Sequence, residues 1–522
     1  MPNEPLSRRL FAILGAARPV RGSSLALLAG LALLAGVSVV AGCNGSGPAA
    51  PPPDTASGAV GERVRIVLDG DVSDWPIESA AWIDDHYLYL RFTIQDEQFT
   101  LQSASKTLAV NLDLDGSAAT GRTSTEEAFA DLGVDMEVQF SPQKEGGGTE
   151  RGTAIFAVAS DGTRTPLNKL DFDFVTVPSF ASSWYEARIS RTPEGEPPIV
   201  AGGLLGPGTI KGVVATLDGE GRVEAYADPF ELESPARCIG GRKLSNLDVP
   251  AKPGGAVRVV SFNVLRSKPV QEPETFRRIL RAIEPDVILF QEWDEGDASV
   301  IRSWLTANLS DIGTWDVSKP EGDMSQGGGV AVASRFPIET IGPAVTREGG
   351  RPVRAAIAAV QTPAGLLLAT SVHLKCCGTK DSREDRQRME EARAVAQRIG
   401  VISKDLRPAM VVVGGDLNLV GSRPPLDVIR SGIDLDASDL TIAESWVFGS
   451  NAIYTWREDG SEFAPGRLDY VMFSDSTADA VQSFALDTNR FTDEALARLG
   501  LDRTDSAASD HLPVVVDLLP IR

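Results

Sequence analysis

The sequence SDHLPVVV, residues 509–516, places an aspartate and a histidine directly before an apolar run that is typical of a buried strand. Histidine is scarce, because the chain of 522 residues contains only three. A single histidine beside a strand is often a core residue with one hydrogen bond. The segment therefore indicates a functional site only if other polar side chains are placed in the same way along the chain.

Four other apolar runs in the second half of the chain end in polar residues. VVSFN ends at Asn263, VILFQE at Glu292, LLLATSVH at His373, and VVVGGDLN at Asp416 and Asn418. Open α/β sheets bind ligands at the edge where such strands end. Burying these groups without partners costs about a few kcal/mol each, so we expect them to share one site. The set is rich in oxygen and lacks a thiolate, which favours Mg²⁺ or Mn²⁺ over zinc.

The chain divides into two predicted domains. Residues 63–235 contain many short apolar or alternating runs broken by turn residues, which predict an all-β sandwich. Residues 236–256 form a linker rich in Gly, Pro and Lys. Residues 257–522 alternate strand patterns with helical ones, including a long amphipathic helix over 382–406, and predict an α/β domain with a large core.

The N-terminus carries a targeting signal. Basic residues precede the apolar run Leu25–Gly42, a pattern typical of a secretory signal. The end of this run, VAGC, resembles the bacterial lipobox, which implies a signal peptide over 1–42 and a lipidated Cys43. Residues 43–62 are rich in Pro, Ala and Gly and predict a flexible tether. Asn44, in place of the Asp that marks inner-membrane retention in some bacteria, favours the outer membrane.

Two alternatives stay open for this exported chain. The apolar run is about long enough to span a bilayer, so an uncleaved transmembrane anchor is the alternative to lipidation. In a compartment that permits disulfides, Cys238 can bridge to Cys376 or to Cys377, and the sequence does not fix the connectivity.

The net charge of the chain limits the classes of partner that it is expected to bind. The net charge is −22, and acidic residues outnumber basic ones in both halves. Nucleic-acid binding usually depends on Lys and Arg that neutralise phosphates, so the composition provides no general attraction for a nucleic acid.

The ordered segments SFN, QE, GGGVAVASRFPI, SVHL, GDLN, YTW, RLDYV and SDHLPV, taken together, resemble the endonuclease/exonuclease/phosphatase family over about residues 257–519. Each segment alone is weak, but eight in order are specific. The resemblance implies a DNase I-like fold, in which two mixed sheets pack face to face between outer helices. It also implies metal-assisted hydrolysis of a phosphoester by water.

The resemblance also implies roles for the metal-side residues. Glu292 is expected to be the main metal ligand, supported by Asn263 and Asp510. Asp416 is expected to position or deprotonate the attacking water. Asn418 is expected to orient Asp416 or the phosphate.

On the phosphate side, the resemblance implies that His511 stabilises the charge developing on the phosphate oxygens and that Asp469 orients its ring. His373 is expected to be a second donor to the phosphate. Arg354 and Lys375 either touch the phosphate or lie on a solvated surface.

The substrate is not fixed by these residues. Leu265 stands two positions after the SFN asparagine, where the DNA-repair branch of the family often has an acidic residue. This departure argues against a specialised DNA-repair enzyme. A nucleic acid, a phospholipid head group and a small phosphoester all remain candidate substrates.

The first domain resembles the carbohydrate-binding family 9-like β-sandwich, through IVLDGDVSDWPIESAAW, AVNLDLDGSAATG and WYEARIS. The resemblance implies either glycan binding, with Trp75 or Trp82 stacked on a sugar, or simple packing against a partner domain. Asp113 and Asp115 can ligate Ca²⁺, or they can belong to an acidic turn at a strand end. The alternative function for the whole chain is a non-catalytic glycan-binding protein of the cell envelope with a relic phosphoesterase scaffold.

Overall fold

The computed structural model describes residues 66–76, 80–93, 100–124, 126–194, 208–235, 244–322, 328–342 and 345–521. The predicted signal peptide, the lipidation site Cys43, the tether and Cys238 lie outside these residues. Cys376 and Cys377 are both free thiols. Among the described residues, no helix combines the length and apolarity needed to cross a membrane.

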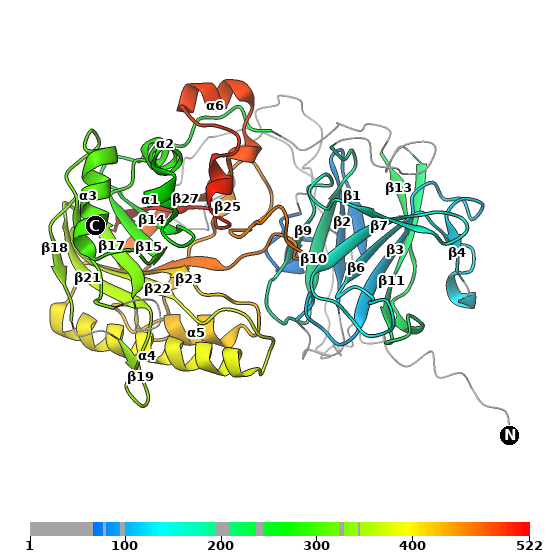
Figure 1. Ribbon diagram of the computed structural model, residues 1–522, viewed down its shortest axis with the longest axis horizontal. Helices are drawn as coiled ribbons and strands as arrows, with labels where there is room; N and C mark the ends of the chain where they lie inside the picture. The colour runs from blue at the N-terminus through cyan, green and yellow to red at the C-terminus, as the bar shows by residue number, and fades with distance from the viewer. Residues whose placement is uncertain are drawn as a thin grey trace, which may run out of the picture.

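The N-terminal region consists of two antiparallel sheets (Figure 1). The smaller sheet has the order β1 (Ala81–Ile83), β2 (Tyr87–Phe92), β10 (Tyr185–Ser190) and β9 (Val175–Val177). The larger has the order β12 (Val223–Tyr226), β11 (Gly208–Leu217), β3 (Thr107–Asp113), β6 (Met136–Phe140), β7 (Thr153–Val158) and β8 (Arg164–Leu167), with β13 (Phe230–Ser234) also paired to β11. An apolar core lies between the two sheets. The all-β prediction is confirmed.

The C-terminal region contains two mixed sheets. The first has the order β16 (Asp316–Ser318), β17 (Gly329–Ser334), β15 (Val287–Trp293), β14 (Val257–Asn263), β28 (Val514–Pro520), β27 (Ala478–Ala485) and β25 (Trp446–Val447). The second has the order β18 (Ile338–Thr340), β21 (Ala355–Thr362), β22 (Gly365–His373), β23 (Met410–Asp416), β26 (Asp469–Phe473) and β24 (Thr441–Ile442). Each region also contains one short two-stranded sheet. In the N-terminal region β4 (Arg122–Thr123) pairs with β5 (Gly133–Val134), and in the C-terminal region β19 (Thr346–Arg347) pairs with β20 (Arg351–Pro352).

Helices cover the outer face of each mixed sheet (Figure 1). On the first sheet these are α2 (Pro273–Ile283), which follows the single turn α1 (Lys268–Gln271), α3 (Ala298–Leu309) and α6 (Asp493–Leu499). On the second they are α4 (Arg383–Leu406) and α5 (Pro424–Arg430). The long helix expected over 382–406 is therefore present, and the side chain of Ser382 caps its first turn by accepting a hydrogen bond from the Asp385 N–H.

Strand periodicity produces the four layers. In β14, Val257 and Val259 face the second sheet, whereas Val260 and Phe262 face the helices. Alternate residues of a strand point to opposite faces, so a strand that is apolar throughout is buried on both sides. The predicted DNase I-like architecture is confirmed.

The smaller sheet of the sandwich is buried on both faces as well. Tyr87, Tyr89, Val175 and Val177 on its outer face belong to the same apolar core as the two mixed sheets, and all six residues of β10 are buried. Figure 1 places β9 and β10 against the C-terminal region. The two regions therefore share a core and pack as one unit.

Polar contacts also join the sandwich to the C-terminal region. Arg490 donates to Asp173 Oδ2 at 2.7 Å, and Asn451 donates to the Tyr89 hydroxyl at 2.8 Å. The Ser179 hydroxyl lies 2.8 Å from the carbonyl oxygens of both Leu419 and Arg467, which belong to segments beside the candidate site. The sandwich thus contacts the backbone near Asn418 and Asp469, two of the predicted site residues.

The two tryptophans that were considered for sugar stacking contribute to packing. Trp75 is buried, and its indole N–H donates to Glu186 Oε1 at 2.7 Å. Trp82 is partly buried against the shared core. Both side chains serve the packing between the regions.

Candidate functional site

Strand register places three predicted site residues in one row. His373 on β22 is the register partner of Asp416 on the parallel strand β23, and Asp416 is the partner of Asp469 on the antiparallel strand β26. Neighbouring strands lie about 4.8 Å apart. The three side chains therefore meet at one edge of the second sheet.

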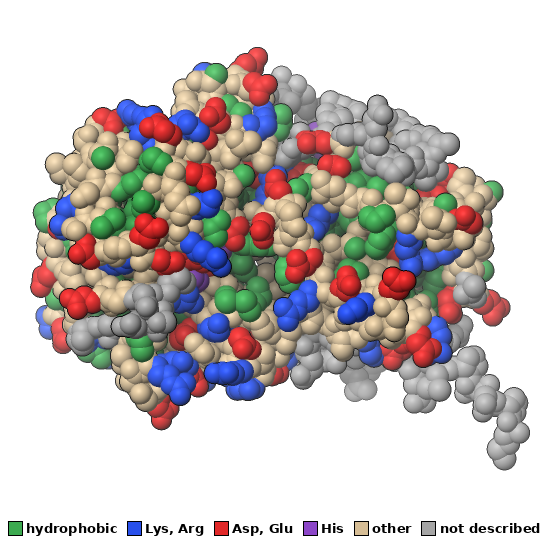
Figure 2. All heavy atoms as spheres, in the orientation of Figure 1, with side chains coloured by type: hydrophobic (Ala, Val, Ile, Leu, Met, Phe, Trp, Pro, Cys, Tyr) green, Lys and Arg blue, Asp and Glu red, His purple; other side chains and the backbone are tan. Residues whose placement is uncertain are grey.

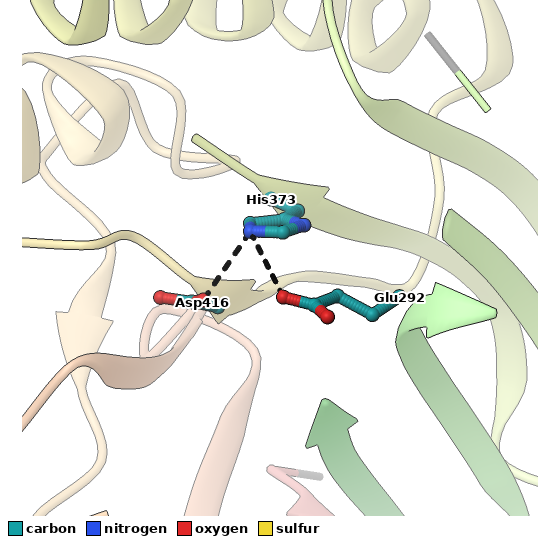
Figure 3. Close-up of side chains that lie close together, drawn as sticks. All are labelled: Glu292, His373 and Asp416. Atoms are coloured by element: carbon teal, nitrogen blue, oxygen red, sulfur yellow. Dashed lines mark ion pairs between the residues drawn. The ribbon is translucent and has the colours of Figure 1, made fainter. Parts of the chain in front are cut away.

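The first sheet brings Asn263 and Glu292 to the same place from the ends of β14 and β15. Glu292 sits at a β-bulge, where the pairing register shifts between Gln291 and Trp293, and it has a left-handed φ of 57°. Such a conformation costs a non-glycine residue about 1–3 kcal/mol and recurs at functional sites. Figure 3 shows the Glu292 carboxylate directed toward His373 and Asp416.

Asp416 is shared by two groups of candidate ligands. One group contains Glu292, His373 and Asp416, and the other contains Asp416, Asp469 and His511. Asp416 Oδ2 lies 3.4 Å from Nε2 of His373 and 3.6 Å from Nε2 of His511. The Asn263 amide links the two sheets by donating to Glu292 Oε1 at 3.3 Å and to Asp416 Oδ2 at 3.2 Å.

The environment of Asp416 raises the pKa of its carboxyl and fixes its orientation. Burial raises its pKa to about 7, with a further contribution from Asp469 and opposition from His511. Asn418, which has a left-handed φ of 50°, donates its backbone N–H to Asp416 Oδ1 and its amide to Oδ2, both at 2.9 Å. These bonds fix the orientation of the carboxylate.

His511 is held in its charged form. Its Nδ1 lies 2.7 Å from Asp469 Oδ2, which also accepts from the Thr455 hydroxyl at 2.7 Å. Burial opposes the charge, but Asp469 and Asp416 outweigh it and raise the pKa of His511 to about 10. The ring therefore carries both protons near neutral pH, with Nε2–H on the side of Asp416.

His373 is held neutral instead. Burial, followed by the charge of Arg354, keeps its pKa well below the usual value. Arg354 donates to Nδ1 at 3.0 Å, so the ring proton is assigned to Nε2, which faces Asp416. The sequence left open whether Arg354 touches the phosphate or lies on a solvated surface. In the structure it orients the His373 imidazole instead.

Asp510 lies apart from both groups. Its Oδ2 accepts from the Trp456 indole at 3.1 Å, and its buried Oδ1 has no hydrogen-bond partner. It lines a cavity of about 230 Å³ together with Leu265, Arg457 and other residues. The Asp-His pair lies before the last strand, since β28 begins at Val514 and His511 bridges to Trp456.

Two supporting residues received no role from the sequence, although they lie in the YTW segment. Thr455 accepts from the backbone N–H of Asp469 at 2.9 Å while its hydroxyl donates to that carboxylate. Trp456 donates to Asp510. Their place in an ordered segment was the available signal.

Residues 260–511 match the sequence model of the endonuclease/exonuclease/phosphatase family. The match covers slightly less than half of the chain, and it shows that this part is similar to the endonucleases, exonucleases and phosphatases of that family. The N-terminal β region has no assigned family. No curated protein matches the chain.

Solved structures resemble the C-terminal region. The catalytic domain of human Nocturnin with bound sulfate is 18% identical over 52% of this chain and 97% of its own, with a TM-score of 0.35. Sphingomyelinase C from Streptomyces griseocarneus is 15% identical over 50% and 99%, with a TM-score of 0.34. Beta toxin from Staphylococcus aureus with bound magnesium ions is 16% identical over 50% and 99%, with a TM-score of 0.33. These scores are below 0.5, so the ligands of these proteins do not identify those of this chain.

Proposed function

We propose that the protein is a Mg²⁺- or Mn²⁺-dependent phosphoesterase in which Asp416 directs the attack of water. The observation that carries this proposal is the position of Asp416 between a neutral imidazole, His373, and a charged one, His511. Hydrolysis of a phosphoester requires a group that accepts a proton and donors that stabilise negative charge on the phosphate oxygens. This arrangement provides both.

The residues present fit a hard divalent ion. Glu292 offers carboxylate oxygens at the sheet edge, where the Asn263 amide nitrogen donates to it, and buried oxygens of Asp469 and Asp510 lack partners. Buried polar atoms are normally satisfied, so unpaired carboxylate oxygens favour an ion or its waters nearby. We propose Glu292 as the main ligand with Asn263 and Asp510 in support. When bound, the ion would lower the pKa of a water and offset phosphate charge.

Asp416 performs the proton transfer in this proposal. A carboxyl with a pKa of about 7 is a stronger base than an ordinary aspartate and is still substantially ionised near neutral pH. The two bonds from Asn418 hold the carboxylate still, so the proton is accepted in one geometry.

The imidazoles perform the charge stabilisation. His511 keeps its second proton because Asp469 faces Nδ1. Its Nε2–H can therefore donate to a phosphate oxygen. His373 contributes a neutral Nε2–H, positioned by Arg354. Donors that are oriented before the reaction stabilise the transition state without reorganising.

The test is a substrate panel with metal depletion. Purified protein is treated with EDTA, supplied with Mg²⁺ or Mn²⁺, and assayed on phospholipids, phosphomonoesters, small phosphodiesters, DNA and RNA. We expect one class to be hydrolysed, activity to vanish with EDTA, and both Glu292→Gln and His511→Ala to be inactive. A panel left unreacted with either metal contradicts the proposal.

Surface charge ranks the substrate classes of this panel. Figure 2 shows basic side chains interspersed with acidic ones on the face drawn, without a continuous basic strip. Together with the net charge of −22, this favours phospholipid head groups or small phosphoesters over nucleic acid. Hydrolysis of DNA or RNA faster than of every other panel member would reverse this order.

We also propose that Cys43 tethers the enzyme to a bacterial membrane, on the outer-membrane side. The support is the lipobox-like end of the apolar run and the tether that follows it. Expression in bacteria with radioactive palmitate tests this proposal. Label should enter the parent protein and be absent from Cys43→Ser.

Glycan binding by the sandwich is retained as the competing function. It predicts binding on a glycan array that survives Glu292→Gln and Asp416→Asn, in a parent protein that hydrolyses nothing in the panel. Activity of the parent with either metal rejects it as the sole function of the chain.

A further inference from the structure

A second group of carboxylates lies in the sandwich, away from the catalytic edge. Asp113 ends β3, Asp115 follows in the next turn, and Asp135 precedes the neighbouring strand β6. One carboxylate oxygen of each residue lies within 4.8 Å of the others. Asp113 and Asp135 are 0% and 1% exposed. Sequence inspection pointed to the first two residues, whereas Asp135 enters the group through the pairing of β3 with β6.

The hydrogen-bond partners of this group are all neutral. Asp113 accepts from the backbone N–H groups of Ser117 and Gly133 at 3.1 and 3.2 Å. Asp115 accepts from the same Ser117 N–H at 2.9 Å and from the hydroxyl of Thr120. Within the described part of the chain, no Lys, Arg or His forms an ion pair with any of the three carboxylates. Buried carboxylates are costly unless a cation offsets them.

One buried oxygen of this group, Oδ1 of Asp135, has no hydrogen-bond partner. The other oxygen of this carboxylate, Oδ2, accepts from the Leu114 N–H at 2.9 Å. A Cβ placed on Gly121 would lie 2.7 Å from this Oδ1, so the turn after Asp115 folds closely beside it. Burial, then the charges of Asp115 and Asp113, raise the pKa of Asp135 to about 7, as expected for carboxylates that repel one another.

We propose that Asp113, Asp115 and Asp135 bind one Ca²⁺ ion. The donor set is entirely oxygen, which disfavours zinc. Calcium binds oxygens at 2.3–2.6 Å in flexible geometry, so oxygens up to about 5 Å apart can share it, whereas Mg²⁺ requires a tighter octahedron. The ion would join the end of β3 to the start of β6 and so stabilise the sandwich.

The experiment uses the full chain, purified in detergent, in a background of Glu292→Gln with Asp416→Asn. This background removes catalytic ligands, so that bound calcium reports on the sandwich and a failure here leaves the proposed catalysis untouched. The protein is stripped with EGTA and titrated with Ca²⁺ by calorimetry, and its Tm is measured with and without the ion. We expect one ion per chain and a Tm rise of about 5 °C or more at saturation.

Two variants make the result specific. Asp135→Asn should weaken calcium binding by about 100-fold or more, and Asp115→Asn, at an exposed position, should do so even if Asp135→Asn fails to fold. Asp131→Asn is the matched control, since its exposed carboxylate faces Lys211 and lies outside the group, and it should bind as the background does. Absence of calcium binding by the background, or equal binding by Asp115→Asn, overturns the proposal.

Discussion

The carboxylates of the candidate functional site and those at the end of β3 are similarly buried but differ in their partners. Asp416 and Asp469 face the imidazoles of His373 and His511. Asp113 and Asp135 face only neutral N–H groups, and one oxygen of Asp135 faces none. Each region gathers its carboxylates by pairing distant strands, yet only one supplies counter-charge from its own side chains.

This difference predicts that a metal ion would have a different role in each of the two regions. The carboxylates of the candidate site are offset by imidazoles and amides, so the C-terminal region should fold without an ion and need one only for the proposed chemistry. The sandwich group lacks such partners, so an ion there should act on stability.

The largest effect is expected for Asp416→Asn. The amide keeps the shape of the carboxylate but does not accept the proton of water, so kcat should fall by about 10²–10⁴-fold. The amide removes the cost of burying a charge and the repulsion from Asp469, which together outweigh the lost attraction to His511, so the Tm should not fall. Kinetics on the identified substrate and calorimetry test both expectations. Asp427→Asn, a half-exposed position on α5, is the control and should match the parent.

His511 and Asp469 should act as one unit. We expect His511→Gln to lower kcat by about 10²–10³-fold, because a charged donor to the phosphate is lost. Asp469→Asn should be nearly as damaging, since the ring loses the partner that holds its charge. The double variant should be little worse than either single one. Fully multiplicative losses would show that the two residues act independently.

Thr455→Val tests the support behind this pair. The hydroxyl donates to Asp469 Oδ2 and accepts from two backbone N–H groups, so its loss leaves buried groups unpaired. A penalty of about 1–2 kcal/mol corresponds to a decrease of about 5–30-fold in kcat if it falls on the orientation of Asp469. Thr455→Ser restores the hydroxyl and should recover most of the activity. Equal losses in both variants would assign the effect to packing.

Thr455 also marks where prediction from the sequence ends. The strands were predictable because short, continuously apolar runs are typical of strands that are buried on both faces, and these runs end in polar residues such as His373 and Asp416. The left-handed turn at Glu292, the bond from Thr455 to Asp469 and the entry of Asp135 into an acidic group were not. Each depends on packing between segments far apart in the chain, which local composition does not encode.

Asp173 extends the comparison to the interface between the regions. Burial would raise its pKa, but Arg188 and Arg490 outweigh burial and hold it well below the usual value. A lowered pKa stabilises the folded state above the unfolded value, about 3.9, and this stability is lost as pH falls below it. Calorimetry should show the Tm of the parent falling between pH 5 and 3. Asp173→Asn should have a lower Tm at pH 7 and a flatter profile in acid.

Glu186, on the same sheet, should respond with the opposite sign. It accepts from Trp75 and Gly70 and forms no ion pair with a Lys, Arg or His of the described residues, and burial, with smaller contributions from Asp69 and Asp74, raises its pKa to about 8. A raised pKa gives stability that is complete below the unfolded value, about 4.3, and is lost as pH rises through 8. Glu186→Gln should therefore flatten the fall in Tm from pH 5 to 8 while leaving the acid limb set by Asp173 in place. If the two variants flatten the same limb, a cationic partner does not decide how these buried carboxylates respond to pH.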